Sequence, residues 1–195
     1  MSADSFGTRP LTPGTWADLE TLFGLPGGSI VHGCWCMFYR RSGKGQPSDP
    51  PNKQALCELV QAGTRPGLIG YLDGQPAGWI SLGPREEYHK LRRSPVMKPV
   101  DDIPVWSVVC SYIARPYRGK GLQHRLLAAA IDFARDSGAT TLEAYPVDKP
   151  ARSHDDFMFF GSRSLYERAG FTEVVRRSPT RLVMRLVLGG QVSPR

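Results

Sequence analysis

The sequence predicts a mixed α/β fold organised around one strand and the helix that follows it. Residues 105–114 are almost all apolar or β-branched, which is typical of a strand covered on both faces. A glycine turn at 118–121 leads into residues 121–138, where apolar side chains recur at helical spacing. Two earlier apolar runs meet at Asp73-Gly74, the pair best suited to a tight hairpin. Strands and helices therefore build one core.

Glycine and proline mark the ends of most elements before the central strand. The stretch 30–39 is dense in aromatic and sulfur-containing side chains, and 42–52 reads as a loop rich in Gly, Pro and Ser. The elements expected in this half are a short strand at 6–11, a helix opened by residues 12–15 and ended by Gly24, a helix at about 53–62, a hairpin at 68–82, and a charged connection at 83–104 that is partly helical at 86–93.

Pro116 stops the central strand, because proline cannot donate to a β-ladder. Ser162 can cap a short helix that Gly170 ends. The elements expected after the central helix are a strand at 140–145, a loop at 147–161, a helix at 162–169, and two strands at 171–176 and 181–188 that turn at Ser178-Pro179. We expect a single domain over residues 1–195, with a flexible tail at 189–195.

Composition narrows the function classes. The chain is 41% hydrophobic and 22% charged, as is usual for a soluble globular protein. Its net charge of +7 suits a polyanionic ligand or nucleic acid. No apolar stretch is long enough to cross a membrane and no signal sequence is visible, so a cytoplasmic location is expected by default. Four cysteines do not form the disulfide framework of a small secreted protein.

The turn from Arg118 to Gly121 predicts an anion site. A glycine turn that opens a helix points unpaired backbone N–H groups, together with the positive end of the helix dipole, toward a ligand. The side chains of Arg118 and Lys120 add positive charge, so a pyrophosphate is the ligand that we expect at this site. The spacing matches neither a Walker A loop nor the dinucleotide fingerprint Gly-x-Gly-x-x-Gly.

This stretch resembles motif A of the GNAT superfamily of CoA-dependent N-acetyltransferases, written Gln/Arg-x-x-Gly-x-Gly/Ala. Arg118 and Gly121 match the motif, whereas Gln123 stands where it has Gly or Ala. Residues 164–171 resemble motif B, and the order of the elements is also that of the family. Gly33–Met37, which reads Gly-Cys-Trp-Cys-Met, further resembles one branch of these acetyltransferases. The resemblance implies a mostly antiparallel sheet, splayed between its fourth and fifth strands, with helices on both faces.

The resemblance also implies acetyl-CoA as co-substrate. Its pantetheine arm would pair with backbone groups at the end of the central strand, and its pyrophosphate would sit on the glycine turn. A backbone N–H near Val109 or Cys110 would polarise the acetyl carbonyl. The residues expected to bind CoA are Tyr112, Ile113, Ala114, Arg118, Gly119, Lys120, Gly121, Leu122, Gln123 and His124.

Two side chains are candidates for proton transfer. Tyr166 is the candidate acid, because tyrosine is protonated at neutral pH and can donate to the departing thiolate. The alternative is a tyrosine that only packs on the sheet. Glu143 is the candidate base, on the strand face that it shares with Thr141 and Tyr145, and its alternative is a solvated or ion-paired strand residue. Water, or a residue of the long connection, could also take the proton; those residues are Glu86, Glu87, His89 and Asp101.

The acceptor pocket is expected among aromatic residues, with plain core packing as the alternative. The candidates are Trp35, Phe38, Tyr39, Phe157 and Phe159, together with the rest of the run 157–160. Cys34 and Cys36 are too close in sequence for an unstrained disulfide, and only His32 lies near enough to make a third zinc ligand. We therefore expect no metal. An acyl-cysteine at Cys110 is a further alternative to direct attack.

The sequence thus predicts an acyltransferase that moves an acetyl group from acetyl-CoA to a primary amine by direct attack in a ternary complex. The acceptor would be a small molecule or a peptide, and the protein a monomer or homodimer. The first alternative is a catalytically inactive sensor that binds acyl-CoA without transferring the acyl group. A basic nucleic-acid-binding protein is the second, but the basic residues are spread along the chain without a recognition motif, so we expect neither nucleic acid nor membrane as a partner.

Overall fold

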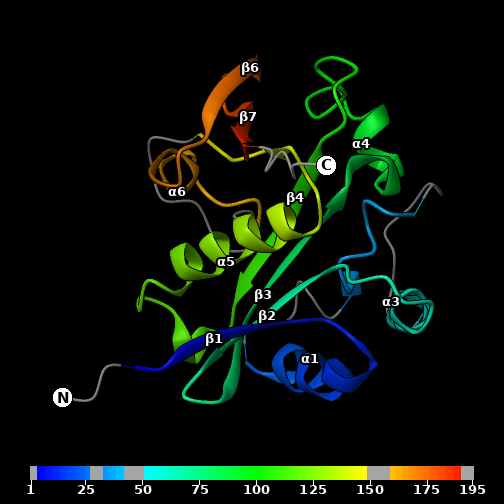
Figure 1. Ribbon diagram of the computed structural model, residues 1–195, viewed down its shortest axis with the longest axis vertical. Coiled ribbons are helices and arrows are strands. Elements are labelled where there is room, and N and C mark those ends of the chain that lie inside the picture. Colours follow the sequence, from blue (N-terminus) through cyan, green and yellow to red (C-terminus); the bar gives the residue numbers. More distant parts are fainter. Residues whose placement is uncertain (1–3, 27–32, 42–50, 149–158, 190–195) are drawn as a thin grey trace, which may run out of the picture.

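The computed structural model describes residues 4–26, 33–41, 51–148 and 159–189. Its strands are β1 (Phe6–Pro10), β2 (Gly67–Leu72), β3 (Gln75–Pro84), β4 (Trp106–Ile113), β5 (Thr141–Ala144), β6 (Thr172–Ser178) and β7 (Arg181–Val187). They form one seven-stranded sheet in the order β1-β2-β3-β4-β5-β7-β6, drawn in Figure 1. All neighbouring strands are antiparallel except β4 and β5. The predicted mixed class and mostly antiparallel sheet are confirmed.

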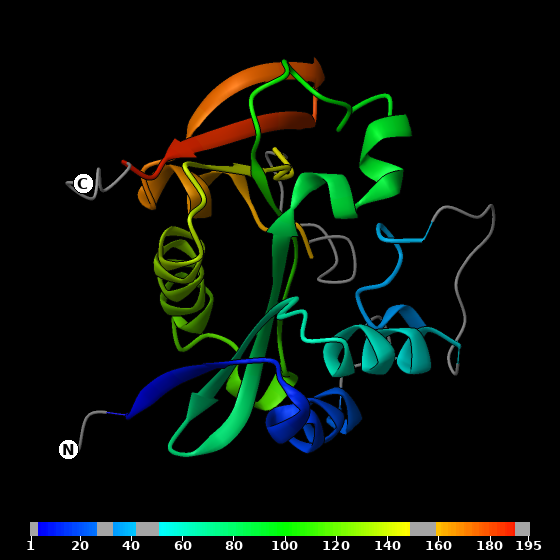
Figure 2. The ribbon, with the colours of Figure 1, turned by 45° about the vertical axis from the view of Figure 1, so that its right-hand side comes forward.

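Helices cover both faces of the sheet. They are α1 (Trp16–Gly24), α3 (Pro51–Gln61), α4 (His89–Arg93), α5 (Leu122–Asp136) and α6 (Arg163–Arg168), with short 3₁₀ turns η1 (Pro13–Thr15), η2 (Arg85–Glu87) and η3 (Arg115–Tyr117). Figure 2 shows α5 and α6 on one side of the sheet and α1, α3 and α4 on the other. Among the described helices, none combines the length and the apolar character that crossing a bilayer requires.

The core lies in two layers separated by the sheet. On the α5 side, Leu126 and Ala130 are buried against Leu142 and Met184, because they follow one another at helical spacing along one face of α5. On the opposite side, α1 and α3 pack on Trp79 and on the aromatic end of β4. As predicted, β4 is buried along almost its whole length.

The hairpin between β2 and β3 turns as its sequence requires. Asp73 and Gly74 have φ angles of 50° and 78°, the left-handed conformation that a primed two-residue turn needs at both positions. The pairing continues from Leu72 opposite Gln75 to Gly67 opposite Ser81. This confirms the predicted hairpin.

The connection between β3 and β4 is structured. Its predicted helical part corresponds to η2 and α4, and Tyr88 and Leu91 are fully buried in a cluster with Val109 and Tyr145. The helix expected at 53–62 begins slightly earlier, at Pro51. Most of the loop expected at 42–52 and most of the tail at 189–195 lie outside the described residues.

Candidate active site

A gap opens in the sheet where β5 ends. The parallel pairing between β4 and β5 runs only from Trp106 opposite Leu142 to Val108 opposite Ala144. Beyond this point β4 continues beside β3 as far as Ile113, while β5 has ended. The edge of β4 that faced β5 is therefore no longer paired with it.

A bulge in β4 marks the point of separation. Ser81 pairs with Cys110 and its neighbour Leu82 pairs with Val108, so Val109 is an extra residue in β4. A bulge of this kind bends its strand and interrupts the regular ladder. It explains why β4 leaves β5 at this residue and not at the end of the strand.

Ser111 directs its backbone N–H into the gap. This N–H donates to the carbonyl oxygen of Phe159 at 2.7 Å, and the N–H of Val147, which follows β5, donates to Gly161 at 3.1 Å. Residues Phe159–Gly161 therefore lie between the separated strands. The Ser111 hydroxyl is buried and has no hydrogen-bond partner among the described residues.

Tyr166 reaches the same region from α6. Ser162 caps this helix by accepting a hydrogen bond from the N–H of Leu165, as the sequence predicted. The Tyr166 side chain is 1% exposed and its ring meets that of Phe171 edge-on at 5.1 Å. Burial, with a smaller contribution from Cys110, raises the pKa of the phenol, which keeps the hydroxyl protonated.

The glycine turn between β4 and α5 has the conformation that its sequence predicts. Gly119 and Gly121 have φ angles of 80° and 71°, and a Cβ built on either would meet no atom within 4 Å. The glycines are thus required by the backbone conformation, and the space around them is open. The Arg118 guanidinium donates from Nε to the carbonyl of Ile113 at 3.0 Å, which ties the turn to the end of β4.

The first turn of α5 presents the remaining residues of this region. Leu122 is buried under β2, whereas His124 is exposed and lies 3.5 Å from an Nη of Arg168 on α6. The half-buried Gln123 extends toward Gly161: its Nε2 would lie 3.7 Å from a Cβ at that glycine. The amide of Gln123 therefore borders the segment that lies in the gap.

Comparison with protein families places these features in a known context. The family model described as the acetyltransferase (GNAT) family matches residues 34–171, well over half of the chain. The chain belongs to the GNAT acetyltransferase family. A comparison with curated protein sequences gives no match.

Solved GNAT structures share the fold across nearly the whole chain. The Salmonella typhimurium protein YncA, solved with its cofactor acetyl-CoA, is 20% identical, with a TM-score of 0.56 over 97% of this chain and 98% of its own. An N-acetyltransferase from Staphylococcus aureus Mu50 is 16% identical, with a TM-score of 0.56 over 95% and 99%. A polyamine N-acetyltransferase from Drosophila melanogaster is 13% identical, with a TM-score of 0.56 over 94% and 100%.

Within this GNAT fold, the residues expected to bind pantetheine differ in whether their backbone groups and side chains point into the gap. The N–H of Ala114 donates to Ala77 of β3 at 3.0 Å, so this donor faces away from the gap. Tyr112 lies opposite Trp79, and its side chain points to the α1 side, where its buried hydroxyl has no partner among the described residues. Because backbone directions alternate along a strand, Ile113 faces the gap with Ser111.

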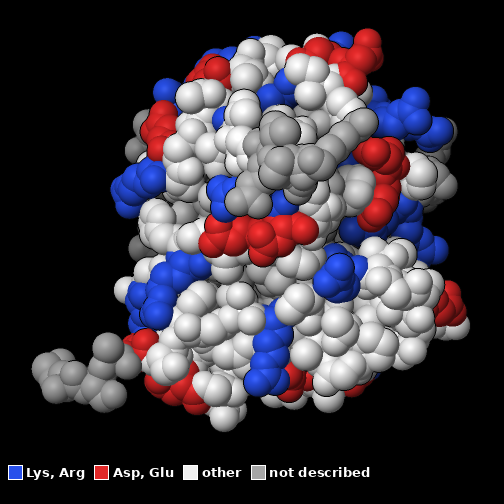
Figure 3. All heavy atoms as spheres, viewed as in Figure 1, with Lys and Arg blue, Asp and Glu red and all other residues white. Residues whose placement is uncertain are grey.

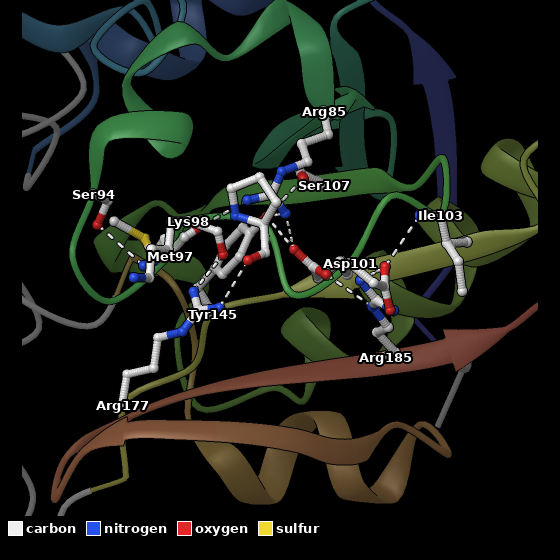
Figure 4. A network of polar contacts seen from close by, with 12 residues as sticks. Arg85, Ser94, Met97, Lys98, Asp101, Ile103, Ser107, Tyr145, Arg177 and Arg185 are labelled. Carbon is white, nitrogen blue, oxygen red and sulfur yellow. Dashed lines mark hydrogen bonds and ion pairs between the residues drawn. The ribbon is translucent and has the colours of Figure 1, made fainter.

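Glu143 lies on the expected face of β5, but its carboxylate is fully engaged. Oε1 accepts from Arg85 and, at 2.8 Å, from the Tyr145 hydroxyl, while Oε2 accepts from Arg185 Nε at 2.8 Å. Figure 4 shows these three partners, Arg85, Tyr145 and Arg185, which come from separate parts of the chain. The residue is 0% exposed and pairs with Ser107, before the strands separate. This geometry favours the ion-paired alternative, and we do not retain Glu143 as the base.

The rival bases are placed differently. Glu87 pairs with the buried Arg40, and Asp101 makes a two-pronged contact with Arg185 at 2.7 and 2.9 Å. Hydrogen bonds from Arg185 hold the pKa of the Asp101 carboxyl below its usual value. Glu86 and His89 are exposed on the connection.

The aromatic candidates divide into two groups. Trp35 is 5% exposed and packs on Trp16 and Phe23 in the α1 layer, with centroids 5.9 and 5.1 Å apart, which favours a core role. Tyr39 and Phe159 are half-buried and flank Phe160 beside the gap. Phe38 is half-buried beneath the Lys90 ammonium, 3.9 Å from its ring centroid. Phe157 lies outside the described residues.

The cysteines are all unbridged thiols. Cys36 accepts a hydrogen bond from Trp79 Nε1 at 3.1 Å, and its neighbour Cys110 and burial raise its pKa. Burial also raises the pKa of Cys34 to about 11. His32 lies outside the described residues, and within the described part of the chain no three metal-ligating side chains are grouped to hold a metal ion.

Sequence reasoning missed three arginines and a serine. Arg85 and Arg185 are 58 and 42 residues from Glu143, so no local spacing indicates that they meet. Arg181 borders the gap because the start of β7 pairs with Val147. Ser111 could have been found, because the expected separation of the fourth and fifth strands leaves backbone groups near the end of the central strand unpaired. The donor expected near Val109 or Cys110 lies one or two residues before it.

Proposed function

We propose that this protein transfers an acetyl group from acetyl-CoA to a primary amine by direct attack in a ternary complex. The observation that carries the proposal is the Ser111 N–H, which faces the gap between β4 and β5. The protonated phenol of Tyr166 borders the segment in this gap, since its Cε2 would lie 3.0 Å from a Cβ at Gly161. Together they supply a donor for a developing oxyanion and an acid for a departing thiolate.

The residues present suit acetyl-CoA. The open left-handed turn at Gly119 and Gly121, with the start of the 15-residue helix α5, offers backbone donors to a pyrophosphate. The buried Ser111 hydroxyl has no partner among the described residues, as expected for a group that meets a ligand. We propose that the backbone of Ser111 and Ile113 faces the pantetheine arm.

The proposed reaction removes two protons from the acceptor nitrogen and delivers one proton to the departing sulfur. The acceptor ammonium loses its proton to water, since the Glu143 carboxylate is held by two arginines. The neutral amine attacks the acetyl carbonyl, and the Ser111 N–H stabilises the negative charge that develops on its oxygen. The attacking nitrogen becomes positively charged and releases its second proton to water. When the carbon–sulfur bond breaks, the Tyr166 hydroxyl gives its proton to the sulfur and regains one from solvent. No cysteine nucleophile takes part.

A binding assay and a turnover assay test this function. Acetyl-CoA should raise the melting temperature, since a ligand of the folded state stabilises it. A panel of amines, including agmatine and polyamines because relatives are named for them, should then release CoA in the presence of enzyme. Unchanged melting at millimolar acetyl-CoA contradicts the proposal, and binding without turnover on any amine indicates a silent sensor.

A further inference from the structure

The ring of Phe160 links the gap to Arg181, the first residue of β7. Its centroid lies 4.5 Å from that of Phe159 and 5.5 Å from that of Tyr39, and the Arg181 guanidinium carbon lies 5.7 Å from it. Phe159 is in turn the residue whose carbonyl meets the Ser111 N–H. A cation therefore stands one aromatic ring away from the proposed reaction centre.

Arg181 is half-buried and has no carboxylate partner among the described residues. The buried arginines Arg40 and Arg85, and the half-buried Arg185, each pair with a carboxylate. Asp148, whose N–H donates to the carbonyl of Thr180 next to Arg181, is bound instead by Arg163 and Arg176. A guanidinium that no carboxylate of the described residues holds is well suited to bind a carboxylate of a ligand.

Tyr39 and Arg181 both contact the ring of Phe160. Burial raises the pKa of the Tyr39 phenol, the charge of Arg181 opposes that rise, and the thiols of Cys34 and Cys110 add to it. Tyr39 is thus affected both by Arg181 and by Cys110, the residue before Ser111. Its ring and that of Phe159 are both half-buried and offer apolar surface along this path.

We propose that the acceptor amine carries a carboxylate, which Arg181 binds, and an apolar or aromatic side chain, which packs on Tyr39 and Phe159. An amino acid has these three groups within a few bonds of one another. The inference rests on the proposed function, because it assigns the acceptor of that same site. A two-pronged contact between guanidinium and carboxylate would orient the amine toward the gap.

Two product analogues that differ only in the carboxylate test the proposal without requiring turnover. N-acetyl-L-phenylalanine and N-acetylphenethylamine are titrated calorimetrically into protein saturated with CoA. Wild type should bind the carboxylate compound at least tenfold more tightly. Arg181→Gln should abolish this difference and leave CoA affinity unchanged, and Arg181→Lys should restore part of it. Arg65→Gln is the matched control, because Arg65 also stands over a phenylalanine ring, at 5.9 Å from the centroid, far along α5 at Phe133.

Equal affinity for the two compounds, binding of neither, or an unchanged preference in Arg181→Gln would each overturn the proposal. Its failure is distinct from failure of the proposed function. If amines are acetylated without preference for a carboxylate, the acceptor assignment is wrong and the enzyme function stands. If the analogues are discriminated through Arg181 but no amine is acetylated, the carboxylate site stands and the transferase function is wrong.

Discussion

The Tyr166 hydroxyl is the most direct residue-level test of the chemistry. Tyr166→Phe removes one hydroxyl and leaves the contact with Phe171 in place, so folding and CoA affinity should survive. The rate should fall by roughly 10²–10⁴, the usual contribution of a positioned acid. Steady-state kinetics should place the fall in kcat rather than KM, since the proton moves only as the bond breaks. A fall below about threefold would assign Tyr166 to packing alone.

The raised pKa of Tyr166 has a consequence for the pH profile. A raised pKa means that the phenol keeps its proton to higher pH, so the acid form is not lost in the working range. We expect kcat/KM to rise with pH as the acceptor amine loses its proton, and then to stay level to about pH 10, the ordinary pKa of tyrosine. A decline that begins near pH 8, and disappears in Tyr166→Phe, would show that Tyr166 ionises earlier.

A variant of Glu143 can distinguish a structural role of this carboxylate from a catalytic one. Glu143→Gln keeps the shape but leaves Arg85 and Arg185 without their common anion, so chemical denaturation should show a loss of about 3–5 kcal/mol, as for breaking a buried ion pair. The kcat of the folded variant should stay within threefold of wild type, with an unchanged pH profile. A hundredfold loss of kcat at nearly unchanged stability would restore Glu143 as the base.

At the scale of the element, the turn before α5 can be tested with a matched glycine. Gly121 and Gly63 both have positive φ, 71° and 91°, and open space around the missing Cβ. Glutamate should strain the backbone similarly at both sites, by about 1–2 kcal/mol. Only Gly121→Glu should abolish acetyl-CoA binding in calorimetry, because it adds negative charge at the proposed pyrophosphate site. Equal affinities of the two variants would remove the anion site from this turn.

The β3–β4 connection is an element whose order comes from distant arginines. Arg177 of β6 donates to the carbonyls of Lys98 and Pro99, and Arg185 of β7 holds Asp101, as Figure 4 shows. Arg85 at the start of the connection donates to Met97 near its middle. A segment that its sequence describes only as long and charged is therefore fixed over the sheet by contacts from strands that come much later in the chain.

For the whole molecule, local sequence patterns predicted the helices, strands and turns. The contacts between side chains that lie far apart in the sequence could not be predicted. Helical spacing and the Asp73-Gly74 turn act within a few residues, so α5 and the β2–β3 hairpin could be predicted. The conformation of the glycine turn at 118–121 could be predicted in the same way, and its role as an anion site stays a prediction. The partners of Glu143 and the neighbours of Phe160 come from separate strands, and a single sequence carries no signal for such contacts. Trp35 has the composition of a pocket residue but lies in the core, and composition alone cannot distinguish the two.

The positive charge of the molecule is distributed over its surface. On the face drawn in Figure 3, Lys and Arg lie interspersed with Asp and Glu, without one continuous basic patch. Several arginines are engaged in ion pairs, including Arg163 and Arg176 with Asp148. The net charge of +7 is a property of the whole chain and reflects an excess of basic over acidic residues. On this face, it does not produce the continuous positive surface that would bind a nucleic-acid backbone.

The contact between Ser111 and Phe159 implies an order of substrate addition. The Ser111 N–H is already used by the chain itself at 2.7 Å, so acetyl-CoA can accept this hydrogen bond only when Phe159 withdraws. Withdrawal must also shift Phe160, and with it the surroundings of Tyr39 and Arg181. The acceptor pocket would then take its working shape only after acetyl-CoA is in place. We expect a dead-end acceptor analogue to inhibit uncompetitively against acetyl-CoA. Mixed inhibition would indicate that either substrate can enter first, and competitive inhibition would indicate that the analogue binds the enzyme without acetyl-CoA and excludes it.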